Sequence, residues 1–228
     1  MEEGMDVMDF EDTLKGLPFY DALTPEEKSE LMEECEDAVF EARQMLHVSG
    51  EECSGLFLVK KGRIRAFNIT PEGREVTLFR LEKGEMCMFS ASCMMKNISF
   101  SISVMAETKV EAIRIPASYF SKLEQKNTQV ALFSKDLLSR RMSDVMWVLE
   151  QILFQSFDQR LAAFLIEQLH FTESNVLTIT HEEIANHMGS AREVVSRMLK
   201  YFEKEGMVAL SRGKVTILDE ERLEDLMA

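Results

Sequence analysis

The sequence contains few cysteines, few prolines and no long apolar run, and these shortages exclude several classes of protein. It contains four cysteines, four prolines and one tryptophan in 228 residues. So few cysteines cannot form the disulfide framework of a small secreted domain. No run of about 18 apolar residues occurs, so a membrane-spanning helix is not expected. The acidic N-terminus lacks the basic flank and apolar core of a signal peptide. We therefore expect a cytoplasmic protein with no membrane partner.

The acidic excess of the chain is unevenly distributed. The formal net charge is −14 at pH 7, which by itself argues against binding a polyanion. Residues 190–214 differ, because they hold six basic residues against three acidic ones. The six are Arg192, Arg197, Lys200, Lys204, Arg212 and Lys214. A locally basic segment in an acidic chain can contact nucleic acid while the remainder keeps non-specific affinity low.

Residues 180–200 have the pattern of two short helices joined by a tight turn at Gly189. Thr180 precedes Glu183 by three positions, and Ser190 precedes Glu193 by three. Both spacings are those of a capping box, in which a hydroxyl and a carboxylate satisfy the first free N–H groups of a helix. The segment therefore predicts a helix-turn-helix.

The second of these helices has an apolar face and a polar face. The apolar residues at helical spacing are Ala191, Val194, Val195, Met198, Leu199 and Phe202. The opposite face carries Arg192, Glu193, Ser196, Arg197 and Lys200. Such polar side chains can bond base edges and phosphates in a DNA major groove. The alternative is an ordinary amphipathic surface helix, whose outer face is polar in any case.

A hairpin with a basic tip follows the two helices. Gly206 ends the helical pattern, and residues 207–210 and 215–218 predict two short strands. The tight turn over residues 211–214 places Arg212 and Lys214 where they can contact phosphates. A helix-turn-helix followed by such a hairpin is a winged helix, which weakens the alternative of a plain surface helix.

Residues 184–217 resemble the DNA-binding domain of the Crp/Fnr family, bacterial transcription regulators related to the cyclic-AMP receptor protein. The resemblance rests on Ile184-Ala185, Gly189, Arg192-Glu193-Val-Val-Ser196-Arg197, Leu199-Lys200 and Ser211-Arg-Gly-Lys214, in register. It implies base reading by Arg192, Glu193, Ser196 and Arg197. Phosphate contacts are expected from Thr180, Ser190, Lys200, Ser211, Arg212 and Lys214. The family also implies a homodimer on a palindrome of double-stranded DNA, with half-sites like TGTGA or TTGA, and RNA polymerase as a partner.

The middle of the chain has the pattern of an antiparallel β-roll. Short strands separated by turns are predicted at residues 56–60, 63–69, 75–81, 99–106 and 110–115. Their order resembles the cyclic-nucleotide-binding-like (cupin-like) effector domain of the same family, so the resemblance begins near residue 17. The predicted fold class is α+β, with a β-roll, a long dimerisation helix and a winged helix-turn-helix. The expected parts are an acidic segment (1–16), the roll (17–120), the long helix with a hinge (121–155) and the DNA-binding domain (156–228).

A long apolar stripe separates the roll from the DNA-binding domain. Its length and the lack of Gly or Pro favour a dimerisation helix, as in the family, over a helix that packs only on its own roll. The expected interface residues are Val130, Phe133, Leu137, Leu138, Met142, Val145, Met146 and Leu149.

The effector is the part of the function that the sequence leaves most open. Cyclic-AMP-binding members of the family use a Gly-Glu pair for the ribose and an Arg-Ser or Arg-Thr pair for the phosphate. Gly84-Glu85 is present, but the second pair is Phe100-Ser101, and a buried phosphate without its bidentate Arg is costly. Lys96 does not reproduce an Arg fork. We therefore do not expect cyclic AMP to bind. We expect an unknown, fairly apolar effector instead. Its expected pocket residues are Gly84, Glu85, Met86, Cys87, Phe89, Phe100 and Ser101.

Two cysteines keep a second kind of sensing open. An iron–sulfur cluster is not expected, because the first 34 residues contain no cysteine. Cys87 and Cys93 lie in the expected effector segment and leave a redox- or metal-responsive regulator as the alternative, although most core cysteines are inert. No catalytic triad, phosphate loop or metal motif is present. We therefore expect no enzyme and assign no catalytic or metal-binding residue.

Overall fold

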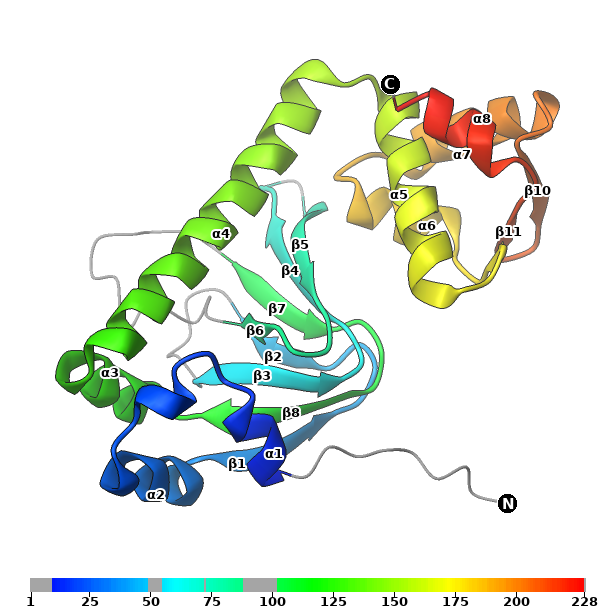
Figure 1. Ribbon diagram of the computed structural model, residues 1–228. Helices are drawn as coiled ribbons and strands as arrows, with labels where there is room; N and C mark the ends of the chain where they lie inside the picture. The colour runs from blue at the N-terminus through cyan, green and yellow to red at the C-terminus, as the bar shows by residue number, and fades with distance from the viewer. Residues whose placement is uncertain (1–9, 49–54, 72, 88–101, 228) are drawn as a thin grey trace, which may run out of the picture. The chain divides into compact units, whose positions relative to one another are not determined.

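The computed structural model describes residues 10–48, 55–71, 73–87 and 102–227 (Figure 1). The chain divides into two compact units. The N-terminal unit comprises residues 1–68 and 78–145, and the C-terminal unit comprises residues 69–77 and 146–228, so one boundary falls within the long helix after Val145. Antiparallel sheets dominate the N-terminal unit, and helices dominate the C-terminal unit, so the predicted α+β class is confirmed. No helix among the described residues is both long and apolar enough to cross a membrane.

The strands of the N-terminal unit form the expected roll from two sheets in the described residues. One sheet has the order β1-β8-β3-β6 and the other β2-β7-β4-β5. The strands are β1 (Glu36–Phe40), β2 (Met45–His47), β3 (Leu56–Lys61), β4 (Ile64–Ile69), β5 (Glu75–Leu81), β6 (Met86–Cys87), β7 (Ser103–Ala106) and β8 (Val110–Ile115). Strands β3, β4, β5 and β8 match the predicted ranges within one residue. The predicted strand 99–106 lies partly outside the described residues.

The sheet that contains β3 separates two apolar clusters, because successive side chains of a strand point to opposite faces. Leu56 and Leu58 join an outer cluster with residues of the N-terminal helices. Phe57 and Val59 join the inner cluster, which includes residues of both sheets. Strand β6 continues the pattern, since it pairs with β3 in antiparallel register. The roll therefore has a covered outer face as well as an interior.

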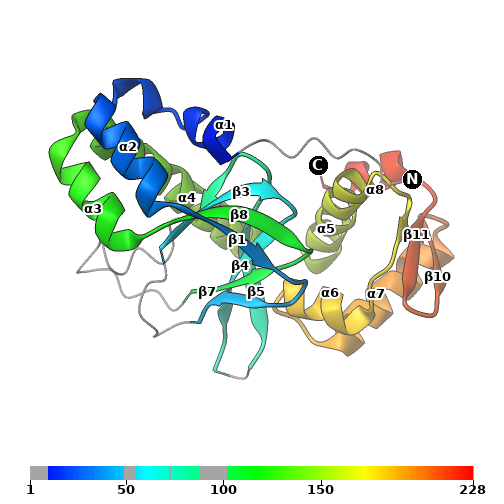
Figure 2. The same ribbon diagram turned by 90° about the horizontal axis from the view of Figure 1, so that it is seen from below.

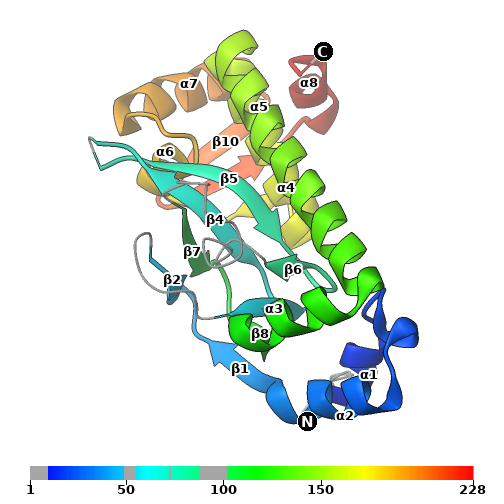
Figure 3. The same cartoon turned by 90° about the vertical axis from the view of Figure 1, so that its left-hand side faces the viewer.

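Helices cover this outer face (Figure 2). They are α1 (Phe10–Lys15), the 3-10 turn η1 (Tyr20–Ala22), α2 (Pro25–Glu34), α3 (Ala117–Lys126) and the start of α4 (Thr128–Phe154). A capping box joins Thr24 and Glu27 at the start of α2, with Pro25 at the first helical position. The long helix expected over residues 121–155 is divided at Asn127, where α3 ends. The side-chain oxygen of Asn127 accepts from the N–H of Gln129. Helix α4 then runs past the turn that leads into β6 (Figure 3).

The C-terminal unit packs helices around a small sheet. Its elements are α5 (Phe157–Thr172), β9 (Val176–Leu177), α6 (His181–His187), α7 (Arg192–Lys204), β10 (Val208–Ser211), β11 (Lys214–Ile217) and α8 (Glu220–Asp225). The strand order is β10-β11-β9. The core of this unit includes Leu165, Ile184, Leu199 and Val215, all fully buried. Burial of that apolar surface positions α6, α7 and the hairpin as one unit.

Candidate nucleic-acid interface and effector region

Helices α6 and α7 form the predicted helix-turn-helix. The Thr180 hydroxyl accepts from the Glu183 N–H, and the Glu183 carboxylate accepts from the Thr180 N–H at 2.8 Å. The capping box predicted there is thus confirmed. Gly189 lies in the turn with φ of 62°, a left-handed conformation that glycine adopts without strain. This residue lets the chain reverse between the two helices.

The predicted capping box at the start of α7 is wrong. Ala191, not Ser190, stands at the N-cap, and no side chain caps the helix there. The backbone N–H of Ser190 donates to the carbonyl of Ala185, so this residue belongs to the turn. Position 191 takes the extended conformation of an N-cap because the turn closes one residue later than the spacing suggested. Glu193 is therefore not engaged as a capping partner.

The two faces predicted for α7 are both present. Val195, Leu199 and Phe202 are fully buried in the core of the C-terminal unit. The opposite face borders one open hollow of about 370 Å³, lined by Arg192, Glu193, Ser196, Arg197 and Lys200. All of these are exposed except Ser196, which is half-buried, and Arg192 is the first residue of the helix. The structure thus brings the four residues expected to read bases, and one expected at phosphate, onto a single surface.

A histidine that sequence reasoning did not select touches this surface. His181 Nδ1 lies 2.7 Å from the Ser196 hydroxyl oxygen. Burial lowers the pKa of His181, and the nearby charges of Arg192 and Lys200 lower it further. The neutral imidazole can accept a hydrogen bond from the Ser196 hydroxyl and so orient it. No local signal could reveal this pair, because its members are fifteen positions apart on different helices.

The predicted wing is present as the β10–β11 hairpin. Its strands lie one residue from the predicted ranges, with Ser211 paired to Lys214. Arg212 and Lys214 are exposed at the tip, and Gly213 has φ of 71°. A Glu203 carboxylate oxygen accepts from the Leu210 N–H at 3.1 Å. This bond ties the wing to α7, and sequence reasoning did not assign it.

The expected dimer-interface residues on α4 divide into two groups. Val130 and Leu137 are buried in the core of their own unit, and Phe133 and Leu138 pack against that core. These four residues therefore contact the core of their own protomer, and Phe133 and Leu138 are only partly buried by it. Met142, Met146 and Leu149, by contrast, are between 42% and 53% exposed. Val145, the eighth expected residue, is half-buried. Leu153 continues the same face at helical spacing and is also exposed.

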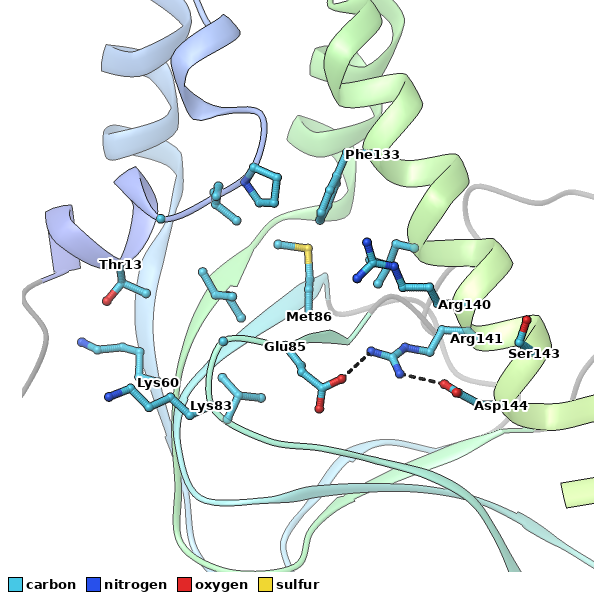
Figure 4. A pocket seen from close by; sticks show the side chains of 17 residues that line it. Thr13, Lys60, Lys83, Glu85, Met86, Phe133, Arg140, Arg141, Ser143 and Asp144 are labelled. Carbon is cyan, nitrogen blue, oxygen red and sulfur yellow. Dashed lines mark hydrogen bonds and ion pairs between the residues drawn. The ribbon is translucent and has the colours of Figure 1, made fainter. Parts of the chain in front are cut away.

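Only part of the expected effector pocket falls in the described residues. Phe89, Phe100, Ser101 and Cys93 lie outside them. Gly84, Glu85 and Met86 line a cavity of about 560 Å³ that also touches α4 (Figure 4). Glu85 is already engaged, since one oxygen accepts from Arg141 at 3.2 Å and the other from the Glu82 N–H at 2.9 Å. A ribose would have to compete with these partners.

Cys87 does not share that cavity. It packs in the inner cluster of the roll and is 2% exposed. Reactive thiols need access, so the burial of Cys87 does not favour a redox role. No group of three or more potential metal ligands occurs among the described residues.

The fold and the α7 surface define a class of protein, a winged helix-turn-helix DNA-binding protein joined to a β-roll. Residues 159–226 match the Crp-like helix-turn-helix domain, and residues 38–127 match the cyclic nucleotide-binding domain. The chain belongs to the Crp/Fnr family of transcription regulators.

Relatives support this membership over almost the whole chain. A structure from Eubacterium rectale, assigned to the transcriptional regulators of the same family, is 42% identical, with a TM-score of 0.91. It covers 93% of this chain and 99% of its own. The cyclic AMP receptor protein of Thermus thermophilus is 27% identical over 213 residues, 93% of this chain and 98% of that protein. The fumarate and nitrate reduction regulatory protein of Escherichia coli K12 is 28% identical over 191 residues, 80% of this chain and 75% of that protein. Two of these three relatives are named as regulators.

Proposed function

We propose that this DNA-binding transcription regulator reads a palindromic operator as a homodimer under the control of a small-molecule effector. The observation that carries the DNA-reading part is the α7 surface, where Arg192, Glu193, Ser196 and Arg197 border one hollow and Lys200 flanks it. Recognition helices of this kind enter the major groove with such a surface. RNA polymerase is the proposed protein partner at the promoter, as the family implies.

The side chains of α7 suit different base edges. Arg192 would bind the O6 and N7 atoms of one guanine through its planar fork. Arg197 would read a second guanine or contact a phosphate. Glu193, which does not cap its helix, would accept from a cytosine amino group. The Ser196 hydroxyl, held by His181, would make a closer and less specific contact.

The phosphate contacts would surround this surface. Arg212 and Lys214 are exposed at the tip of the wing. Thr180 is exposed at the start of α6, where free N–H groups and the helix dipole favour an anion. Ser190 and Ser211 complete the proposed set with Lys200.

The second half of α4 provides the proposed dimer contact. Met142, Met146, Leu149 and Leu153 recur at spacings of four, three and four and are all exposed in the protomer. Two such stripes can pack together as in a coiled coil. A two-fold dimer would place two copies of α7 about 34 Å apart, one turn of DNA, which requires a symmetric operator.

An unbiased selection of bound oligonucleotides from a random pool tests the proposal directly. A symmetric motif with half-sites like TGTGA or TTGA is the expected result. The matched control is the Arg192→Ala/Arg197→Ala protein, which should enrich no symmetric motif. Recovery of no symmetric sequence by the wild-type protein, with or without added extract of small molecules from its host, would refute the proposal.

A further inference from the structure

The cavity that borders Gly84 and Met86 lies outside the roll. Leu58 and Met86 line it, and both belong to the outer cluster that the N-terminal helices and α4 cover. Phe57 and Cys87, their neighbours in the chain, instead join the cluster between the two sheets. The cavity therefore lies mainly on the outer side of the sheet that contains β3 and β6, although Val59 of the inner cluster also borders it. Its volume of about 560 Å³ is within the usual range of small-molecule pockets, about 300–1,000 Å³.

The lining of this cavity combines an apolar floor with a positive surplus. Four basic residues, Lys60, Lys83, Arg140 and Arg141, border it together with two acidic ones, Glu85 and Asp144. This sign is opposite to that of the whole chain, whose net charge is −14. Figure 4 shows the two lysines on one side of the cavity and the two arginines on the α4 side, with Met86 between them. Asp37 and Asp136 pair with Lys60 and Arg140 from outside the lining and partly neutralise this surplus. Low-dielectric walls concentrate the field that remains, so an anion is favoured over a cation.

Arg141 provides a second, independent observation. Its side chain is 8% exposed, one terminal nitrogen donates to Asp144 at 2.8 Å and the other donates to Glu85 at 3.2 Å. Its Nε atom is buried and has no hydrogen-bond partner among the described residues. A buried N–H of a charged group without an acceptor is costly. Because this atom is buried, a ligand carboxylate would reach it only after the guanidinium turned toward the cavity, where the ligand would share the guanidinium with Glu85.

The dimer contact proposed above would leave this cavity open. Arg140 and Met142 are two positions apart on α4, which places them about 200° apart around the helix. Asp144 and Met146 have the same relation. The cavity and the exposed apolar stripe are thus on opposite flanks of α4, and a partner packed on the stripe would not fill the cavity.

We propose that the cavity binds an amphipathic monocarboxylic acid, with an alkyl or aryl body on the floor and its carboxylate near Arg141 and Arg140. The floor suits the apolar body because it includes Leu17, Leu58 and Leu137. Burial of such a body would strengthen binding about fourfold for each CH₂ group removed from water. The identification of this ligand as the effector rests on the proposed function, because Glu85 and Arg141 link the β-roll to α4.

Isothermal titration calorimetry with octanoate tests the site. The full-length protein should bind octanoate saturably, whereas octylamine and 1-octanol, which share its chain, should bind at least tenfold more weakly. Lys83→Ala and Arg140→Ala alter exposed side chains and should each weaken octanoate binding severalfold. Arg141→Gln should weaken it by about 10-fold to 100-fold, the effect of one charge-assisted hydrogen bond. Lys109→Ala, an exposed lysine of the same unit outside the cavity, is the matched control and should bind as the wild type does.

The outcomes separate the site from the proposed function. Absence of saturable octanoate binding, or equal affinity in the wild type and in both Lys83→Ala and Arg140→Ala, overturns the site, whatever Arg141→Gln does to folding. Equal affinity for octanoate and octylamine overturns the anion preference. Operator binding, measured by fluorescence anisotropy with and without octanoate, tests the effector role. Octanoate binding that leaves operator affinity unchanged overturns that role, while failure of the protein to bind any operator overturns the proposed function and not the site.

Discussion

Replacing Arg192 with alanine should remove a base contact and not merely a positive charge. The side chain is exposed at the first position of α7. Its truncation therefore uncovers no buried group of the protein. The fall in operator affinity then measures the loss of the DNA contact itself. One bidentate Arg–guanine pair contributes about 1–3 kcal/mol of discrimination. A dimer makes the contact twice, so the expected cost is about 2–6 kcal/mol, roughly 30-fold to 20,000-fold in operator affinity.

Fluorescence anisotropy with two labelled operators separates the base contact from a phosphate contact. One operator carries the selected sequence, and the other has the guanine pair of each half-site replaced. Arg192→Ala should bind both operators equally, because only the wild type can distinguish them. Its salt dependence should be close to that of the wild type. Removal of one phosphate interaction per protomer would instead lower the slope of log affinity against log salt by about 1.8 for the dimer.

Lys200→Ala is the matched control for this experiment. Lys200 lies on the same face of α7 and is assigned to phosphate. This variant should lower affinity for both operators by the same factor and reduce the salt slope. The reasoning about Arg192 is refuted if Arg192→Ala behaves as Lys200→Ala is expected to, with the preference between the two operators intact.

Three further predictions follow from particular contacts. Met142→Glu/Met146→Glu should weaken dimerisation at least about 100-fold, because each unpaired buried carboxylate costs several kcal/mol. Sedimentation of this variant, compared with that of the control variant Gln151→Glu, measures the effect. A Met142→Glu/Met146→Glu protein that is still a dimer at micromolar concentration would contradict the prediction. The free energy of unfolding should fall as the pH drops below about 6.5, because His181 takes up a proton in the unfolded protein but, with its lowered pKa, not in the folded protein. Urea unfolding across this pH range should show a smaller fall for His181→Gln than for the wild type. Identical pH profiles for the two proteins would contradict this prediction. Glu203→Gln keeps an acceptor for the Leu210 N–H, whereas Glu203→Ala does not. Only the alanine variant should therefore loosen the wing, which would be seen as faster amide hydrogen exchange at Leu210. Equal exchange rates in the two variants would contradict the role of this hydrogen bond.

The elements that the sequence determined by itself are those whose signals are local. The capping box at Thr180, the glycine turn at Gly189 and the alternation of faces along α7 depend on spacings of a few residues, and the structure contains each of them. The strands from β3 to β5 were predicted within one residue for the same reason, because β-branched and aromatic runs bounded by turns need no distant partner to be recognised. The hairpin after α7 likewise follows from its turn residues.

The features that only the tertiary structure decided depend on residues far apart in the chain. The apolar stripe of α4 reads as continuous in sequence, but its first half is covered by the outer cluster of its own unit and its second half is exposed. Periodicity cannot separate these halves, because it reports that a face is apolar and not what covers it. The pairs Glu85–Arg141 and His181–Ser196 span 56 and 15 positions. They exist only because packing brings separate elements together, and the cavity beside Arg141 exists for the same reason.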